Sequence, residues 1–397
     1  MLFYLKEMII MKPFSKLLDS FSEGIFKNLN DKKIELENKG IIIHDLFVGT
    51  PDFEPNIKIK QALSEACLSS DDYKYSLRVL PELKDEFIKY YKNRFNVELT
   101  YDEIAMCNGT QEGMCHIGMC LCDEGDYCLL PNPGYPAFQS SADLAKANII
   151  YYPILEENDF MPRLDLLDEG ILKKIKYVII SYPSNPTGGV ITKDRYMEII
   201  ALAKKYDFII INDNAYSDIV FDGFESFSFL ELDGAKDVGV EFYSLSKSFN
   251  TTGARISFLL GNKKLVAAFE KLRSQYDFGM FIPIQRAAIE ALKLDRYIVL
   301  QQQAIYELRR NVLCEGLTNI GWPVKKSKGT MFVFARIPGK YKNSMEFSME
   351  LLEKANVLVT PGITFGPLGD QYVRFALVKT EEELLKIIEV IKKSNII

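Results

Sequence analysis

Lys247 lies in the segment YSLSKSFNTTGAR (residues 243–255), directly after the strand-like run VGVEFYSL. A charged side chain beside a core strand is costly unless a partner neutralises it or a reaction removes its charge. Lys247 is therefore either an ordinary solvated loop residue or a group with a chemical task. The same segment supplies a second cation, Arg255, and the hydroxyl groups of Ser244 and Ser246.

A second polar segment, NGTQEG (residues 108–113), lies between an expected strand and an expected helix. The backbone N–H groups of Gly109, Thr110 and Gln111, at the start of that helix, would favour an anion such as phosphate. Taken alone, the segment favours a simple glycine turn. Together with Arg255 and the two serines, it predicts a phosphate site built from two distant parts of the sequence.

Further polar residues follow other strand-like runs, where ligands of open α/β sheets bind. Asp213 follows the run Phe208–Asn212, and a carboxylate there needs a cationic partner. Its alternative roles are a helix N-cap and a partner for a protonated ring nitrogen. Asn185, in SNPTGG, and Tyr216 could reach a ring oxygen. Tyr135, in NPGYPAF, is either a stacking group for the ring or a surface aromatic in a proline-rich turn.

These groups together describe pyridoxal 5′-phosphate, which offers a phosphate, a ring nitrogen and an aldehyde that a lysine can bind. The cost of Lys247 is then explained, because the cofactor is its partner at rest. The two histidines, His44 and His116, lie in no motif with Ser, Asp or Cys. Acid–base chemistry is therefore expected from Lys, Asp, Glu or Tyr.

The order of strand-like and helical runs along the sequence predicts the elements that must position these residues. From about residue 104, strand-like and helical runs alternate, as in IAMCN, TQEGMCHIGMCL, KYVIISYPSNPTGG, DRYMEIIALAKKY, DFIIINDNAYSD and VEFYSLSK. This alternation predicts an α/β domain with a mainly parallel sheet. A long helix is expected from about Arg296 to Asn319, followed by a smaller α+β domain. We divide the chain into an N-terminal segment (1–48) that packs with the small domain, a large cofactor-binding domain (49–295) and the small C-terminal domain (296–397).

Composition limits the remaining alternatives. The chain has 397 residues, of which 48% are hydrophobic and 26% charged, so it can form a large core. A net charge of −6 predicts no nucleic-acid partner, and the apolar runs are too short to predict a membrane span. Seven cysteines without a recognisable signal peptide indicate a reducing cytoplasm, and we expect them to be core residues rather than metal ligands. MLFYLKEMII resembles a short leader, so translation could start at Met1 or at Met11.

From about Phe14 to its C-terminus, the chain resembles the class I/II aminotransferases of the fold-type I pyridoxal-phosphate superfamily. SYPSNPTGG, NDNAYSDI and YSLSKSFNTTGAR match the asparagine, aspartate and lysine motifs of that family in order and spacing. GAKDVGVEFYSLSKSFNTTG and DFGMFIPIQRAAIEAL most resemble its LL-diaminopimelate aminotransferase-like branch. The resemblance implies a large domain with a mainly parallel seven-stranded sheet flanked by helices, and a smaller α+β domain.

The resemblance also implies a role for each candidate residue. Lys247 binds the aldehyde and moves the proton of the substrate Cα. The implied cofactor-binding set is Asp213 at the ring nitrogen, Asn185 and Tyr216 at the ring oxygen, Tyr135 on the ring face, and Gly109, Thr110, Gln111, Ser244, Ser246 and Arg255 at the phosphate. The implied substrate-binding set is Arg374, in YVRFAL, at the α-carboxylate, with Asn185 and the backbone of Gly49, in VGTPDF.

One implied residue acts across subunits. Tyr75, in YKYSLRVLPEL, matches the tyrosine that family members give to the neighbouring subunit's phosphate, with Tyr73 as its rival. An obligate homodimer is therefore implied.

The expected activity is transfer of an amino group between an L-amino acid and a 2-oxo acid by a ping-pong route. The amino acid is LL-diaminopimelate or another, such as aspartate or alanine. One alternative on the same fold is a C–S β-lyase or a cyclopropane-carboxylate-type synthase, because these enzymes share the same lysine, aspartate and arginine. Another is a non-enzymatic aminotransferase-like sensor, although such regulators carry a DNA-binding segment and a basic patch.

Overall fold

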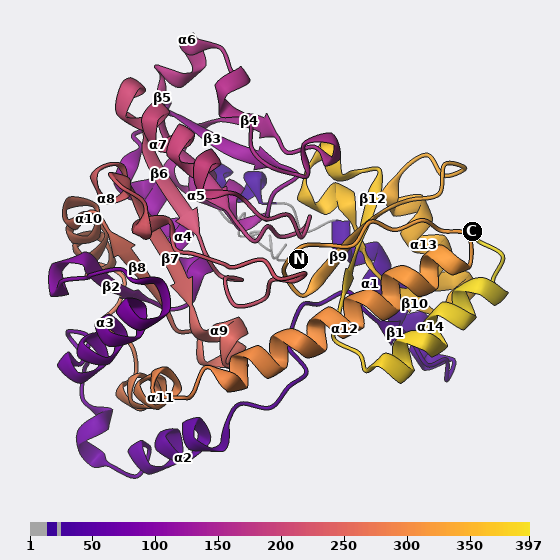
Figure 1. Cartoon of the computed structure of the whole chain (residues 1–397), viewed down its shortest axis with the longest axis horizontal. Coiled ribbons are helices and arrows are strands. Elements are labelled where there is room, and N and C mark those ends of the chain that lie inside the picture. The colour runs from indigo at the N-terminus through magenta and orange to yellow at the C-terminus, as the bar shows by residue number, and fades with distance from the viewer. Residues whose placement is uncertain (1–13, 22–24) are drawn as a thin grey trace, which may run out of the picture.

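A seven-stranded sheet forms the centre of the larger part of the molecule (Figure 1). The computed structural model describes residues 14–21 and 25–397, so the expected leader and both candidate start sites lie outside the described residues. In spatial order the strands are β2 (Ile104–Cys107), β8 (Ser257–Gly261), β7 (Gly239–Ser244), β6 (Ile209–Asp213), β5 (Ile175–Ser181), β3 (Tyr127–Asn132) and β4 (Asn148–Pro153). Only the pairings of β8 with its neighbours β2 and β7 are antiparallel, so the predicted mainly parallel sheet is confirmed.

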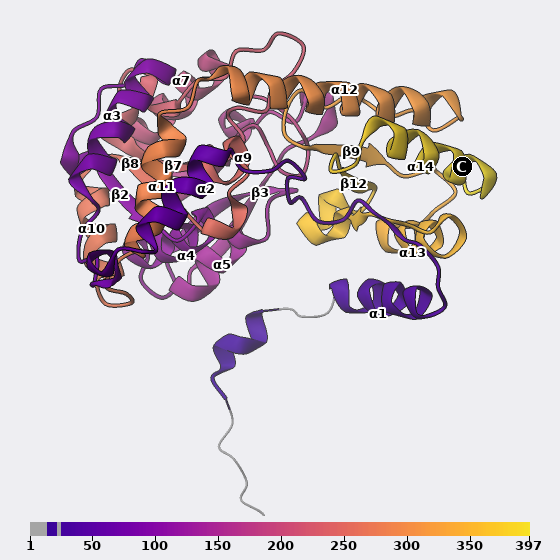
Figure 2. The ribbon, with the colours of Figure 1, turned by 90° about the horizontal axis from the view of Figure 1, so that it is seen from below.

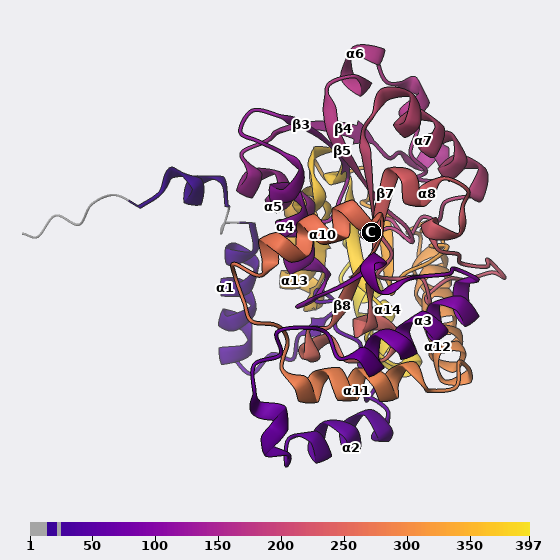
Figure 3. The same ribbon diagram turned by 90° about the vertical axis from the view of Figure 1, so that its left-hand side faces the viewer.

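Helices cover both faces of this sheet (Figure 3). Alternate residues of one strand enter different cores: Val178 and Ile180 pack with α3 and α7, whereas Tyr177 and Ile179 pack with α4, α5 and α10. Burial on both faces explains why the strands read as continuous apolar runs. The helices of this part are α2 (Ile57–Ala66), α3 (Pro81–Phe95), α4 (Thr110–Leu121), α5 (Ala137–Ala145), α6 (Glu169–Leu172), α7 (Lys193–Tyr206), α8 (Ala235–Val238), α9 (Leu245–Ser248), α10 (Lys263–Arg273) and α11 (Ile282–Leu292).

A second group of elements surrounds a separate core that includes Trp322 and Phe375. Its three-stranded antiparallel sheet has the order β11 (Thr360–Pro361), β12 (Tyr372–Ala376), β9 (Phe332–Arg336). Its helices are α12 (Tyr297–Asn319), α13 (Ser344–Ala355) and α14 (Glu381–Lys393). The N-terminal segment adds α1 (Ile25–Asn38) and β1 (His44–Asp45), and β1 pairs in parallel with β10 (Val357–Leu358).

The long helix α12 joins the two groups of elements (Figure 2). Near its start, Gln302 donates a hydrogen bond to the carbonyl oxygen of Lys247 at 2.9 Å. Further along, the Arg309 guanidinium binds both carboxylate oxygens of Asp52, at 2.7 and 2.8 Å, and the carbonyl oxygen of Leu377. One rigid helix therefore links the turn that carries the lysine to β12. Within the described ranges, no helix combines the length and apolar character that a bilayer crossing needs.

The contact between α4 and α5 gives a test of packing beside the proposed site. A methyl group added at Gly118 of α4 would overlap the carbonyl and hydroxyl oxygens of Ser141 on α5. Gly118→Ala should therefore lower the free energy of unfolding by about 1–3 kcal/mol in denaturant titration, despite the better helix propensity of Ala. Gly339→Ala, where the added methyl would meet no atom within 4 Å, is the matched control and should change it by less than about 0.5 kcal/mol. Equal effects of the two variants would contradict this account.

Candidate active site

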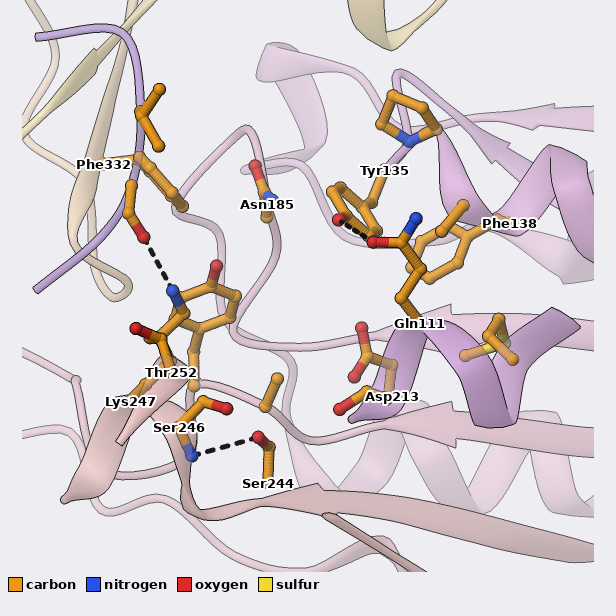
Figure 4. Close-up of a pocket in the computed structure, with 18 of the residues that line it drawn as sticks. Gln111, Tyr135, Phe138, Asn185, Asp213, Ser244, Ser246, Lys247, Thr252 and Phe332 are labelled. Carbon is orange, nitrogen blue, oxygen red and sulfur yellow. Dashed lines mark hydrogen bonds between the residues drawn. The ribbon is translucent and has the colours of Figure 1, made fainter. Parts of the chain in front are cut away.

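A cavity of about 560 Å³ lies beyond the carboxyl ends of β5, β6 and β7 (Figure 4). β9 and β12 of the second group of elements complete its wall through Phe332 and Arg374. The predicted residues that line it are Gly49, Thr110, Gln111, Tyr135, Asn185, Asp213, Tyr216, Ser244, Ser246, Lys247, Arg255 and Arg374. Residues that are up to 325 positions apart in the sequence therefore meet in one cavity.

Lys247 projects into this cavity from the single-turn helix α9. The Ser244 hydroxyl caps the start of that helix, since it accepts a hydrogen bond from the backbone N–H of Ser246 at 3.1 Å. The Lys247 amine donates to the carbonyl oxygen of Gly49 at 2.7 Å. Burial, and then the positive charges of Arg374 and Arg255, lowers the pKa of Lys247 to about 8. A large fraction of this amine is therefore neutral near pH 8 and able to act as a nucleophile or base.

Asp213 ends β6 and is 7% exposed. The Ser181 hydroxyl donates to its Oδ2 at 3.1 Å, whereas Oδ1 is buried and has no hydrogen-bond partner among the described residues. Burial raises the pKa of Asp213 to about 6, although the Ser181 hydroxyl and the Ala215 N–H act in the opposite direction. A buried carboxylate oxygen of this kind fits a cationic N–H group of a ligand in the cavity.

Another part of the cavity suits an anion. Thr110 and Gln111 begin α4, and the Gly109 Cα lies against the Arg255 side chain. A methyl group on Gly109 would lie 2.6 Å from the Arg255 Cζ, and Gly109 has a φ of +86°, so only glycine fits there. The hydroxyl-bearing residues Ser244 and Ser246 line the same cavity.

Arg374 is 8% exposed and its guanidinium is held by neutral oxygens. Nη1 donates to Asn185 Oδ1 at 2.9 Å, and Nη2 donates to the carbonyl oxygen of Phe47 at 2.9 Å and to Thr360 Oγ1 at 3.3 Å. Its Nε has no hydrogen-bond partner within residues 14–21 and 25–397. Burial lowers the pKa of Arg374 to about 10, so the guanidinium stays charged at neutral pH, and the hydrogen-bond partners that the described residues offer it are neutral.

Two tyrosine rings complete the wall. Tyr135 donates from its hydroxyl to Gln111 Oε1 at 3.3 Å, and burial raises its pKa (Figure 4). Tyr216 is 8% exposed, and burial also raises its pKa, so both phenols stay protonated and can donate hydrogen bonds.

The two rival tyrosines lie outside the cavity that the described residues form. Tyr75 is 79% exposed and packs against Phe278 with ring centroids 5.1 Å apart. Tyr73 is also exposed, and its hydroxyl donates to the carbonyl oxygen of Cys67 at 3.0 Å. Neither tyrosine lines the cavity formed by the described residues, so the choice between Tyr75 and Tyr73 stays a prediction.

Comparison with known protein families identifies the family and the activity of this chain. The sequence profile of the family described as aminotransferase class I and II matches residues 41–391. The chain belongs to this family. This match confirms the predicted family and the fold-type I architecture. It also confirms that the chain is an aminotransferase with pyridoxal 5′-phosphate as cofactor.

Individual relatives match the aminotransferase over nearly its whole length. An LL-diaminopimelate aminotransferase of Dehalococcoides mccartyi is 38% identical over 377 residues, which cover 94% of this chain and 96% of the relative. The glutamate-pyruvate aminotransferase AlaC of Escherichia coli is 37% identical over 379 residues, 94% and 92% of the two chains. The solved structure of substrate-bound BacF from Bacillus subtilis has a TM-score of 0.93 at 34% identity, and covers 97% of this chain and 98% of BacF.

The described residues of the aminotransferase fit its cofactor. The unpartnered Asp213 oxygen suits a protonated ring nitrogen, Arg255 and the start of α4 suit a phosphate, and the Lys247 amine lies in the same cavity and suits the aldehyde. Sequence reasoning missed Phe332 and Phe365, whose rings lie beside Arg374, because no local pattern distinguishes them from core residues.

The pKa of Lys247 gives a prediction for the aminotransferase freed of cofactor. After addition of pyridoxal 5′-phosphate and reduction with borohydride, the adduct should map to Lys247. The initial rate should rise with a midpoint near pH 8, because only the neutral amine condenses and an ordinary lysine titrates near 10.5. Lys247→Arg keeps the positive charge and should abolish this adduct. An adduct on another lysine in the unaltered protein would refute the assignment.

Proposed function

We propose that the aminotransferase uses Lys247 to carry the proton of the substrate Cα and Arg374 to bind the substrate α-carboxylate. When bound, the cofactor supplies an electron-withdrawing ring that makes this proton acidic. The observation that carries the proposal is the buried Asp213 oxygen without a partner, in the same cavity as an amine whose pKa is lowered. A carboxylate at the ring nitrogen keeps that nitrogen protonated, so it strengthens the electron withdrawal.

Arg374 and Asn185 receive the carboxylate of the amino acid. Arg374 Nη1 and Asn185 Oδ1 are already hydrogen bonded, so the two side chains are held together before substrate arrives. A guanidinium can bind a carboxylate through two parallel hydrogen bonds, which fixes the Cα near the Lys247 amine. Because the carboxylate is common to all amino acids, this contact serves every substrate equally.

For the side chain of the amino acid, we favour a substrate with a single carboxylate, such as alanine. The wall residues Phe47, Val48, Thr50, Phe332 and Phe365 are neutral, and pyruvate, the oxo acid in the name of the relative AlaC, has a single carboxylate. LL-Diaminopimelate is the second candidate, since several relatives carry its name.

A half-reaction screen tests the proposed activity. Purified protein loaded with cofactor is incubated with single amino acids and with diaminopimelate isomers, and the 2-oxo acid formed is measured. Stoichiometric formation of the corresponding 2-oxo acid, retaining the side chain, supports transamination. Catalytic release of pyruvate and ammonia from cysteine-type substrates would instead identify a C–S β-lyase.

Arg374→Ala should lower kcat/KM by about 30-fold to several thousandfold, which corresponds to about 2–5 kcal/mol for a truncated buried charge pair. The loss should be similar for every amino acid that the screen identifies, because all share the carboxylate. Steady-state kinetics on three substrates of different size measure it. A loss confined to one substrate would assign Arg374 to side-chain recognition instead.

We also propose that the protein acts in the cytoplasm, because its cysteines are free thiols. We further propose that it forms a homodimer. Tyr73, Tyr75, Leu77, Phe278 and Phe281 form an exposed apolar cluster, of the kind that marks protein–protein interfaces. The cluster is well anchored, since the nearby Arg286 guanidinium binds both carboxylate oxygens of Asp72, at 2.6 and 2.9 Å. A second copy of the chain would cover it and bring Tyr75 to the neighbouring phosphate.

Subunit mixing tests the shared site. Lys247→Ala and Tyr75→Ala are prepared separately and mixed under conditions that exchange subunits. If Tyr75 acts across the interface, one site of each mixed dimer collects both defects and the other is intact, so about a quarter of all sites should regain activity. If exchange is shown to occur and activity stays at the level of the unmixed variants, Tyr75 does not act in the partner's site. The same experiment with Tyr73→Ala then tests its rival.

A further inference from the structure

Phe332 contacts three of the residues that line the proposed active site. Its ring centroid lies 4.0 Å from the Arg374 guanidinium carbon, and its ring meets Tyr216 edge-on with centroids 5.8 Å apart. It is also packed against Gly49, where an added methyl group would lie 2.5 Å from Phe332 Cε1. Phe332 is 2% exposed and lines the cavity itself (Figure 4).

We propose that Phe332 is a positioning residue that holds the Arg374 guanidinium and the Gly49 backbone in the arrangement that receives the substrate carboxylate. This inference rests on the proposed role of Arg374. Phe332 would act through these neighbours.

The contact with Arg374 fixes a charge without neutralising it. The face of an aromatic ring attracts a guanidinium, most strongly when water is excluded. A ring offers no carboxylate that would compete with substrate for the guanidinium. The polar partners of Arg374, namely Asn185 Oδ1, the Phe47 carbonyl and Thr360 Oγ1, are neutral as well. The side chain is thus held in place while its charge stays available to an incoming carboxylate.

The contact with Gly49 extends this positioning to the lysine. The Gly49 carbonyl oxygen accepts the hydrogen bond from the Lys247 amine at 2.7 Å. Because the ring of Phe332 lies where a side chain at residue 49 would project, it sets how closely this backbone approaches the cavity. One ring therefore governs the spacing between the carboxylate-binding group and the carbonyl that holds the amine.

The backbone before Phe332 is itself held firmly. Thr330 adopts a φ of +68°, which is rare for a β-branched residue and persists only where the surroundings enforce it. Its N–H donates to the Ile219 carbonyl at 2.8 Å, and its Oγ1 accepts from the Phe332 N–H at 3.2 Å. Phe332 also pairs in register with Ala376, two residues beyond Arg374 on β12. The ring is therefore placed by contacts on both sides.

The first test separates carboxylate binding from general stability. Phe332→Leu should raise the dissociation constant of propionate, a carboxylate without an amine, by about 2- to 30-fold, as the loss of a cation–π contact predicts. KM for all amino acids should rise by a similar factor, while cofactor retention on dialysis stays unchanged. The matched control is Phe375→Leu, because Phe375 is the strand neighbour of Arg374, is fully buried and packs on Trp322, and is not among the described residues that line the cavity. Phe332→Met serves if the Leu variant does not fold.

The control variant Phe375→Leu should have a lower thermal unfolding midpoint and an unchanged affinity for propionate. Equal loss of affinity in Phe375→Leu and Phe332→Leu would show a purely structural role and overturn the inference. Arg374→Ala distinguishes a failure of the proposed role of Arg374 from a failure of the inference about Phe332. If Arg374→Ala leaves propionate binding unchanged, the proposed role of Arg374 fails. If Arg374→Ala weakens binding and Phe332→Leu does not, the inference about Phe332 alone fails.

A second test uses steric complementarity. Gly49→Ala alone should weaken propionate binding because its methyl group overlaps the Phe332 ring. Adding Phe332→Leu removes the overlapping ring atoms, so the double variant should bind propionate more tightly than Gly49→Ala. A double variant no better than Gly49→Ala would contradict direct coupling between the two positions.

Discussion

An excess of positive charge around the cavity is the constraint on which the active site depends. Among the described residues that line the cavity, Lys247, Arg255 and Arg374 are basic and Asp213 alone is acidic. Charges removed from water are costly unless opposite charges meet them. The cavity therefore suits anionic ligands, and the proposed phosphate and α-carboxylate would supply the missing charge. The same positive charge lowers the pKa of Lys247. Burial is the larger cause, and the charges of Arg374 and Arg255 add to it.

Rigid surroundings let the fold hold these like charges close together. The turn that carries Lys247 is capped by Ser244, and its carbonyl oxygen is held by Gln302 of α12. The same helix holds Asp52, near Gly49, through Arg309. The turn that carries Lys247 and the segment that contains Gly49 are therefore both held by α12.

The sequence predicts the site residues that follow the strands of the sheet. It does not predict the residues that reach the site through contacts between distant segments. Lys247, Asp213 and Asn185 each follow an apolar run, and the carboxyl ends of parallel strands meet at one edge, so order along the chain suffices to bring them together. The long helix and the mainly parallel sheet were predictable for the same reason. Phe332 contacts Gly49 across 283 positions, and a phenylalanine in a strand reads only as core. The roles of Phe332 and Gln302 thus become visible only when their neighbours are known.

Two glycines show how side chains far away in sequence fix residue identity in this site. Gly109 lies against Arg255, where a phosphate is proposed to bind, and Gly49 lies against Phe332, beside the proposed carboxylate site. At Gly49 no positive φ requires glycine, so the close approach of the ring alone explains it. Each glycine thus lets a residue from another part of the chain approach the backbone that faces a ligand anion. The two glycines and the cations near them would serve one requirement, which is that anions bind close to the backbone in this cavity.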